Sequence, residues 1–107
     1  MFAASVMIVA TVAMAANGSF TLAAARRTHT IAMDGTRFVP ETHTVGQGDR
    51  VVWVNKDPFP HTATAAGKFD SKPMAAGDAW SFAATEAGEF AYVCTLHPGM
   101  QGELIVK

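Results

Sequence analysis

Cysteine is scarce in this chain of 107 residues, which contains only Cys94. A single cysteine excludes a disulfide within the chain, so the fold depends on core packing, with or without a metal. Charge is also sparse and balanced, because eight Lys and Arg residues against nine Asp and Glu residues give a formal net charge of −1. This balance argues against a nucleic-acid-binding protein, which would show a basic patch or stripe. The length allows one domain.

The first 25 residues contain no charged residue, and every Lys, Arg, Asp and Glu lies after Ala25. Residues 6–16 are almost wholly apolar, and residues 13–15 and 23–25 fit the small-x-small cleavage pattern of a secretory signal. The usual Lys or Arg after Met1 is missing. An uncleaved anchor is the alternative, but a span needs about 20 apolar residues, and Asn17-Gly18-Ser19 interrupts the run. We predict a cleaved signal peptide over 1–25, an exported domain over 26–107 and a periplasmic location.

Sustained helical periodicity is missing from the exported part, where short apolar runs alternate with turn signals. This pattern predicts an all-β fold, a small antiparallel sandwich or barrel of about seven strands. The alternating aromatic residues Trp53, Trp80, Phe82, Phe90 and Tyr92 are predicted to lie in its core. The seven strands are expected at His29–Met33, Thr42–Val45, Arg50–Val54, His61–Ala65, Asp78–Ala83, Glu89–Cys94 and Gly102–Val106.

The single cysteine ends one of these strands. Phe90, Tyr92 and Cys94 alternate along it, so the thiol is expected to point inward with the two aromatic rings. One interpretation is a buried free cysteine, which packs like a small hydrophobic residue. His97 and Met100 follow in the same short segment, however. A thiolate, an imidazole and a thioether together form a donor set that suits copper.

A trigonal copper site with two histidines and one cysteine needs another imidazole from elsewhere in the chain. His29, His43 and His61 are available. His61 is favoured because it follows a predicted core strand and the constrained Phe59-Pro60 turn, which would deliver it to one end of the sandwich. His29 and His43 each lie between threonines and are predicted to be ordinary solvent-facing strand residues.

Two separated segments carry a family resemblance: VVWVNKDPFPHTAT at 51–64 and YVCTLHPGMQGELIVK at 92–107. They resemble the cupredoxins, the small blue copper proteins, and within them the amicyanin- and plastocyanin-like branch with its Cys-x-x-His-x-x-Met loop. The resemblance extends from about residue 29 to Lys107. It implies a Greek-key β-sandwich around one type 1 copper ion, with His61, Cys94 and His97 as equatorial ligands and Met100 as a weak axial ligand.

The chain departs from the family pattern in both ligand segments. Thr62 stands where many relatives have asparagine, so the hydroxyls of Thr62 and Thr95 are expected to replace the usual side-chain bridge between the ligand loops. Leu96 stands where proline is common, so the loop lacks the backbone restriction that a proline would impose there.

Four ligands leave no open position for a substrate, and the chain has no His-x-His motif for further copper ions, so no enzyme activity is predicted. The resemblance implies a soluble periplasmic electron carrier that exchanges single electrons with redox protein partners. The alternative is a periplasmic protein for copper delivery, storage or resistance. The exported part has only Met33, Met74 and Met100, fewer methionines than such carriers tend to have.

A transient docking surface is expected around His97, and we expect a monomer that contacts no nucleic acid and meets a membrane only through its export signal. Lys56 and Asp57, in the turn before His61, are predicted to be simply solvated. The predicted docking surface is apolar and consists of Phe59, Pro60, Met74, Leu96 and Pro98.

Overall fold

The computed structural model describes residues 26–107, so the predicted signal peptide lies outside the described residues. The described part contains nine strands and no helix, and thus no helix that could cross a membrane. The strands are β1 Thr28–Met33, β2 Phe38–Val39, β3 Thr42–Val45, β4 Asp49–Asn55, β5 Thr64–Ala65, β6 Phe69–Asp70, β7 Ala79–Ala84, β8 Gly88–Val93 and β9 Gln101–Val106.

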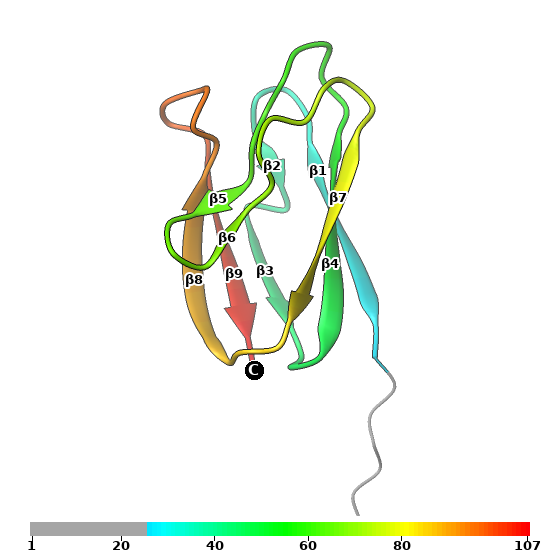
Figure 1. Cartoon of the computed structure of the whole chain (residues 1–107), viewed down its shortest axis with the longest axis vertical. Coiled ribbons are helices and arrows are strands. Elements are labelled where there is room, and N and C mark those ends of the chain that lie inside the picture. The colour runs from blue at the N-terminus through cyan, green and yellow to red at the C-terminus, as the bar shows by residue number, and fades with distance from the viewer. Residues whose placement is uncertain (1–25) are drawn as a thin grey trace, which may run out of the picture.

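The strands form two sheets that face each other as the layers of a sandwich (Figure 1). One sheet has the order β2-β1-β4-β7 and the other the order β3-β9-β8-β5-β6. The all-β sandwich predicted from the sequence is confirmed. The expectation of a purely antiparallel arrangement is wrong, because β1 pairs with β4 and β3 with β9 in parallel.

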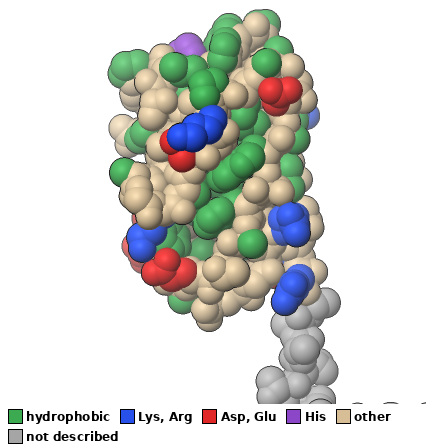
Figure 2. Space-filling model, in the orientation of Figure 1, with side chains coloured by type: hydrophobic (Ala, Val, Ile, Leu, Met, Phe, Trp, Pro, Cys, Tyr) green, Lys and Arg blue, Asp and Glu red, His purple; other side chains and the backbone are tan. Residues whose placement is uncertain are grey.

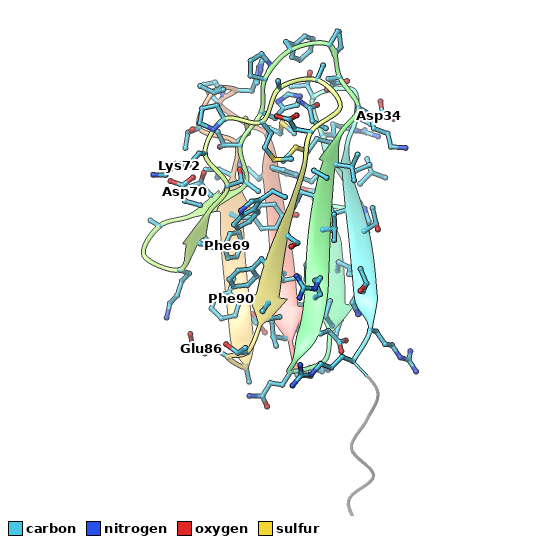
Figure 3. The ribbon with its side chains drawn as sticks, turned by 45° about the vertical axis from the view of Figure 1, so that its right-hand side comes forward. Asp34, Phe69, Asp70, Lys72, Glu86 and Phe90 are labelled. Atoms are coloured by element: carbon cyan, nitrogen blue, oxygen red, sulfur yellow. The ribbon has the colours of Figure 1, made fainter. Side chains whose placement is uncertain are left out.

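Alternation along the strands builds the core between the layers. In β4, Val51, Trp53 and Asn55 are buried while their neighbours are more exposed, as one face of a strand requires. Trp53 and Tyr92 lie in the core as predicted, with ring centroids 5.4 Å apart. The other three predicted core aromatics, Trp80, Phe82 and Phe90, are half-buried and cover the core from its side. Figure 3 shows Phe69 and Phe90 along this side.

One cross-strand pair explains a glycine in the core. Tyr92 of β8 stands opposite Gly102 of β9, and its ring covers the space where a side chain of residue 102 would stand. A Cβ atom on Gly102 would lie 2.5 Å from Cζ of Tyr92, closer than real contacts allow. Burial of this ring raises the pKa of the Tyr92 hydroxyl to about 12.

The observed strands differ from prediction where they are shortest. The strand expected at His61–Ala65 is reduced to β5, and His61 instead forms an isolated bridge with Met74. β2 and β6 have two residues each. Alternation cannot be recognised over so few residues, so these pairings are decided by neighbouring strands rather than by local pattern.

Candidate metal centre

The connections after β1, β4, β6 and β8 meet at one end of the sandwich, the upper end in Figure 1. The sulfur atoms, drawn in yellow in Figure 3, gather at this end beneath the loops. The start of β1 and the end of β9 lie at the opposite end (Figure 1). The fold therefore brings the segments around residues 57–62 and 94–100 together although they are far apart in the sequence.

The segment from Cys94 to Met100 closes on itself through its backbone. The amide of Cys94 donates to the carbonyl of Met100 over 3.0 Å, and the amide of Met100 donates to the carbonyl of His97 over 3.1 Å. The amide of His97 in turn donates to the carbonyl of Cys94 over 3.4 Å. Gly99 has φ +94°, a conformation that favours glycine. The three candidate ligands of this segment are thus held on one tight loop.

The Cys94 thiol lies inside this loop, 2% exposed, as its strand position predicted. The backbone amide of Thr62 donates to Sγ over 3.3 Å. The Nδ1 atom of His61 lies 3.6 Å from Sγ. The fold has therefore placed the sulfur of Cys94 and one ring nitrogen of His61 side by side.

The His61 ring is fully buried and held from its far side. Its Nε2 atom lies 2.8 Å from Oδ2 of Asp57, which fixes Nε2 as the protonated nitrogen and leaves the Nδ1 lone pair facing Cys94. A carboxylate partner of this kind orients a metal-binding imidazole and raises its basicity.

Asp57 is itself built into the structure, so the prediction that it is simply solvated is wrong. The residue is buried, and its two carboxylate oxygens accept the backbone amides of Gly35 and Thr36, each over 2.8 Å. The hydrogen bond from His61 contributes most to lowering the pKa of Asp57, and the two amides add to it against the opposing effect of burial. The Asp-Gly turn after β1 would have given only a weak sequence signal for this contact.

Asn55, the last residue of β4, fixes the loop that carries His61. Its Nδ2 atom donates to the carbonyls of Phe59 and Met74 over 2.8 and 2.9 Å. Its Oδ1 atom accepts the amide of Asp57 over 2.9 Å. All the side-chain groups of this buried amide are used, so the loop geometry follows directly from the end of a core strand.

His97 and Met100 are the other two candidate ligands. His97 is half-buried, and its ring centroid lies 4.7 Å from that of His61. Met100 is 3% exposed. Among residues 26–107, no group of three or more His, Cys, Asp or Glu side chains has a geometry ready to hold a metal ion. The structure thus brings Sγ of Cys94 to within 3.6 Å of Nδ1 of His61 and places the ring of His97 beside that of His61.

A hydroxyl pair joins the two loops that carry the candidate ligands. Oγ1 of Thr62 accepts the backbone amide of Thr95 over 2.9 Å and lies 3.1 Å from the Thr95 hydroxyl. The Thr64 hydroxyl adds a contact of 3.0 Å to the same oxygen. The expected replacement of the bridge by Thr62 and Thr95 is confirmed.

Apolar side chains surround the site on the surface. Phe59 is 39% and Leu96 46% exposed, and Pro60 and Pro98 are exposed as well. Figure 2 shows a histidine side chain beside hydrophobic side chains at this end of the molecule. Met74, predicted to belong to this surface, is instead 3% exposed because its backbone pairs with that of His61 beneath the loops.

His29 and His43 lie at the opposite end of the sandwich, and the prediction that they face solvent is wrong. Both are half-buried, and Nδ1 of His29 lies 2.9 Å from Nε2 of His43. Strand alternation could have predicted this position. His29 is two residues from Ile31 and His43 two residues from Val45, so each histidine lies on the same strand face as a core residue.

Comparison with known proteins gives a consistent set of relatives. A family model described as a cupredoxin-like domain matches residues 3–106. The chain is 40% identical over 74 residues to amicyanin of Paracoccus denitrificans, covering 64% of this chain and 56% of the relative. It is 35% identical over 85 residues to chloroplastic plastocyanin of Chlamydomonas reinhardtii, covering 65% of this chain and 58% of that one. The match therefore spans less than two thirds of either relative.

A solved structure of similar shape is that of an amicyanin mutant in its Cu(I) form. Its TM-score is 0.70 at 28% identity, over 75% of this chain and 82% of the other. The likeness in shape therefore extends over three quarters of the chain.

Proposed function

Because the chain belongs to the cupredoxin-like family, we propose that it is a type 1 (blue) copper protein that carries single electrons between redox proteins. Copper is its cofactor, and His61, Cys94, His97 and Met100 hold it. The observation that carries the proposal is the buried pair of Cys94 Sγ and His61 Nδ1, 3.6 Å apart. Two donors each about 2.0–2.3 Å from one metal ion lie at such a separation.

The donor set fits copper of this type. One thiolate and two imidazoles, with a weak thioether on the axis, are the ligands of blue copper sites, which supply a reversible one-electron couple. Hydrogen bonds around the sulfur tune the potential of such a site. In this chain the Thr62 amide has that role at Sγ, and Asp57 sets the tautomer of His61.

The protein holds the candidate ligands rigidly and shields them from water. Cys94, His61 and Met100 are each at most 3% exposed, and Asn55, Asp57 and the Thr62–Thr95 pair fix their loops through hydrogen bonds. Buried ligands fit an electron carrier better than a copper-delivery protein, which must release its ion to an acceptor. The same closure leaves no position for a substrate, so we propose no enzyme activity.

Electrons are proposed to leave and enter at His97, the one half-exposed candidate ligand. The apolar side chains around it, Phe59, Pro60, Leu96 and Pro98, would dock a redox partner over a small and transient interface. We further propose that the protein acts as a monomer in the periplasm after loss of residues 1–25. Cell fractionation and mass spectrometry of the mature protein test that location.

Spectroscopy of the copper-loaded, oxidised protein tests the function. We expect an intense visible absorption from the copper–thiolate bond and the narrow copper hyperfine splitting of a type 1 site in electron paramagnetic resonance (EPR). Cys94→Ser is expected to abolish the colour, whereas Thr95→Ser, which keeps a hydroxyl in the loop, is expected to retain it. A folded protein that takes up Cu(II) yet stays colourless, with a freely titratable thiol, would contradict the proposal.

A kinetic experiment separates electron transfer from copper delivery. The reduced protein should pass its electron rapidly to an oxidised small redox protein while its copper stays bound. Loss of copper to an acceptor without redox cycling would instead support delivery.

A further inference from the structure

Two histidines and an aspartate form a hydrogen-bonded chain at the end of the sandwich away from the candidate copper site. Nδ1 of His29 lies 2.9 Å from Nε2 of His43, and Nε2 of His29 lies 2.8 Å from Oδ2 of Asp49. Both ring nitrogens of His29 are therefore engaged. The two imidazoles meet edge to face, with centroids 4.9 Å apart.

The chain joins the two sheets. His29 lies on β1 and His43 on β3, which belong to opposite layers, and each ring stands at an inward-facing position next to core residues. Asp49 is fixed independently, because its carboxylate also accepts the amides of Gly46 and Arg27 over 2.9 and 3.0 Å. The nitrogen pair is thus held by two strands and a rigid carboxylate.

We propose that His29 Nδ1 and His43 Nε2 form a second metal site, which takes a divalent copper ion at the position now bridged by a proton. Nitrogen ligands about 2.0–2.1 Å from a metal and at right angles to each other lie about 2.9 Å apart, and the observed separation is 2.9 Å. Right-angled nitrogen and oxygen ligands are typical of tetragonal Cu(II), whereas tetrahedral Zn(II) needs a wider pair. A separation of this size is also ordinary for the hydrogen bond that now joins the rings, and it fits the ligand spacing of Cu(II) better than that of Zn(II).

Asp49 orients the site rather than binding the ion. Its oxygen meets the far nitrogen of His29, the arrangement in which a carboxylate fixes the tautomer of a metal-binding histidine. With Nε2–H donated to Asp49, Nδ1 of His29 has the lone pair that a metal requires and now accepts the Nε2–H of His43. When the ion binds, His43 loses this proton from Nε2 and takes one up at Nδ1, so the neutral ring changes tautomer with no net change in protons. Because Asp49 does not converge with the two nitrogens, the site has two protein ligands, and water supplies the others.

Access and charge set the expected strength of the site. A hollow beside His29 opens to solvent, and its lining includes Asp49, Arg27, Thr44, Gln47 and Lys107. The cationic side chains of Arg27 and Lys107 oppose a divalent ion and Asp49 favours it. We therefore expect binding that exchanges readily with a chelator, unlike copper in the buried site.

The experiment adds Cu(II) alone to protein whose first site already holds one copper ion. Calorimetry should show a second equivalent, and EPR should show a new tetragonal signal with splitting from two imidazole nitrogens. His43→Gln should weaken this second binding by at least tenfold, because one of two protein ligands is lost. Asp49→Asn, which replaces the orienting carboxylate with an amide, should weaken it by about 10–100-fold. The blue signal should be unchanged in both variants.

A matched control is His61→Gln, which removes a ligand of the other site; this variant should lose the blue signal and still bind one Cu(II) ion with the tetragonal EPR signal. Circular dichroism confirms that each variant is folded, and His29→Gln replaces His43→Gln if the latter is not. Equal binding of Cu(II) to the wild-type protein and a folded His43→Gln variant would overturn the proposal, as would the absence of a second equivalent. Either result leaves the proposed electron-transfer function intact, because that function is read from the blue signal.

Discussion

Asp57 Oδ2 accepts a hydrogen bond of 2.8 Å from Nε2 of His61, and this contact links the turn after β1 to the candidate copper site. The same carboxylate accepts two backbone amides from that turn. The orientation of a buried imidazole therefore depends on a segment that contributes no ligand. Without Asp57, the Nδ1 lone pair would have no fixed direction toward Cys94.

Replacing Asp57 with Asn should weaken copper binding about 10–100-fold, as loss of an orienting partner does at other metal sites. An amide can place its NH₂ group against Nε2, which favours the wrong tautomer of His61. Competition with a copper chelator measures the affinity. Asp34→Asn, in the exposed turn labelled in Figure 3, is the matched control and should bind as the wild type does. Equal affinities of the Asp57 and Asp34 variants would show that Asp57 does not orient His61.

Thr62→Val keeps the shape of the side chain and removes the hydroxyl that joins the two ligand loops. The amide of Thr95 then loses its acceptor, which should lower the free energy of unfolding by about 1–3 kcal/mol. The amide of residue 62 still reaches Cys94 Sγ, so the blue absorption should persist with a shifted maximum. Chemical denaturation and visible spectra measure both effects. Thr44→Val, at an exposed position of β3, is the control, and an equal loss there would refute the bridge.

Gly102→Ala should destabilise the protein by about 1–3 kcal/mol, because the new methyl group overlaps the Tyr92 ring. Thermal unfolding should show a fall in Tm of several degrees, about 4–8 °C per kcal/mol for a domain of this size. Gly102→Ala should cost less stability in a protein that already carries Tyr92→Val than it costs in the wild type. Additive effects of the two substitutions would show that the ring is not the cause.

Asp70 should make stability sensitive to acid. The backbone amide of Lys72 contributes most to lowering the pKa of Asp70, and the Thr64 hydroxyl also favours the ionised form. A carboxyl with a lower pKa in the folded than in the unfolded state stabilises the fold above its ordinary pKa, about 3.9, and this stabilisation is lost as the pH falls below that value.

Denaturation of the wild type and of Asp70→Asn from pH 6 to pH 2 tests this. The variant should lose less stability over the acid range, by a small amount because the group is exposed. Asp34→Asn serves again as the control. Parallel curves for the wild type and Asp70→Asn would contradict the expectation.

The local sequence pattern was sufficient to predict several features of the structure. Alternation along β8 and into the next residue predicted that Cys94 points inward with Tyr92, and the spacing of Cys94, His97 and Met100 indicated that they share one loop. Turn signals separated the longer strands correctly to within a few residues. These features depend on side-chain direction and chain flexibility, which neighbouring residues in the sequence determine.

Other features were predicted wrongly or not at all, because partners distant in the sequence decide them. Asp57 resembles any turn aspartate until the Asp-Gly turn after β1 folds against it. Met74 is buried because its backbone meets His61. The parallel pairing of β1 with β4 and of β3 with β9 could not be predicted, because the sequence of a strand does not indicate the direction of the strand beside it.

The sequence by itself therefore determined the donor types, their order and the faces of the long strands, because these follow from residue chemistry and the two-residue period of a strand. Only the tertiary structure decided that Asp57 orients His61 and that His29 and His43 meet between the sheets. The physical reason is that a hydrogen bond needs its donor and acceptor within about 3 Å of each other, and packing of the two layers brings these groups together from positions far apart in the chain.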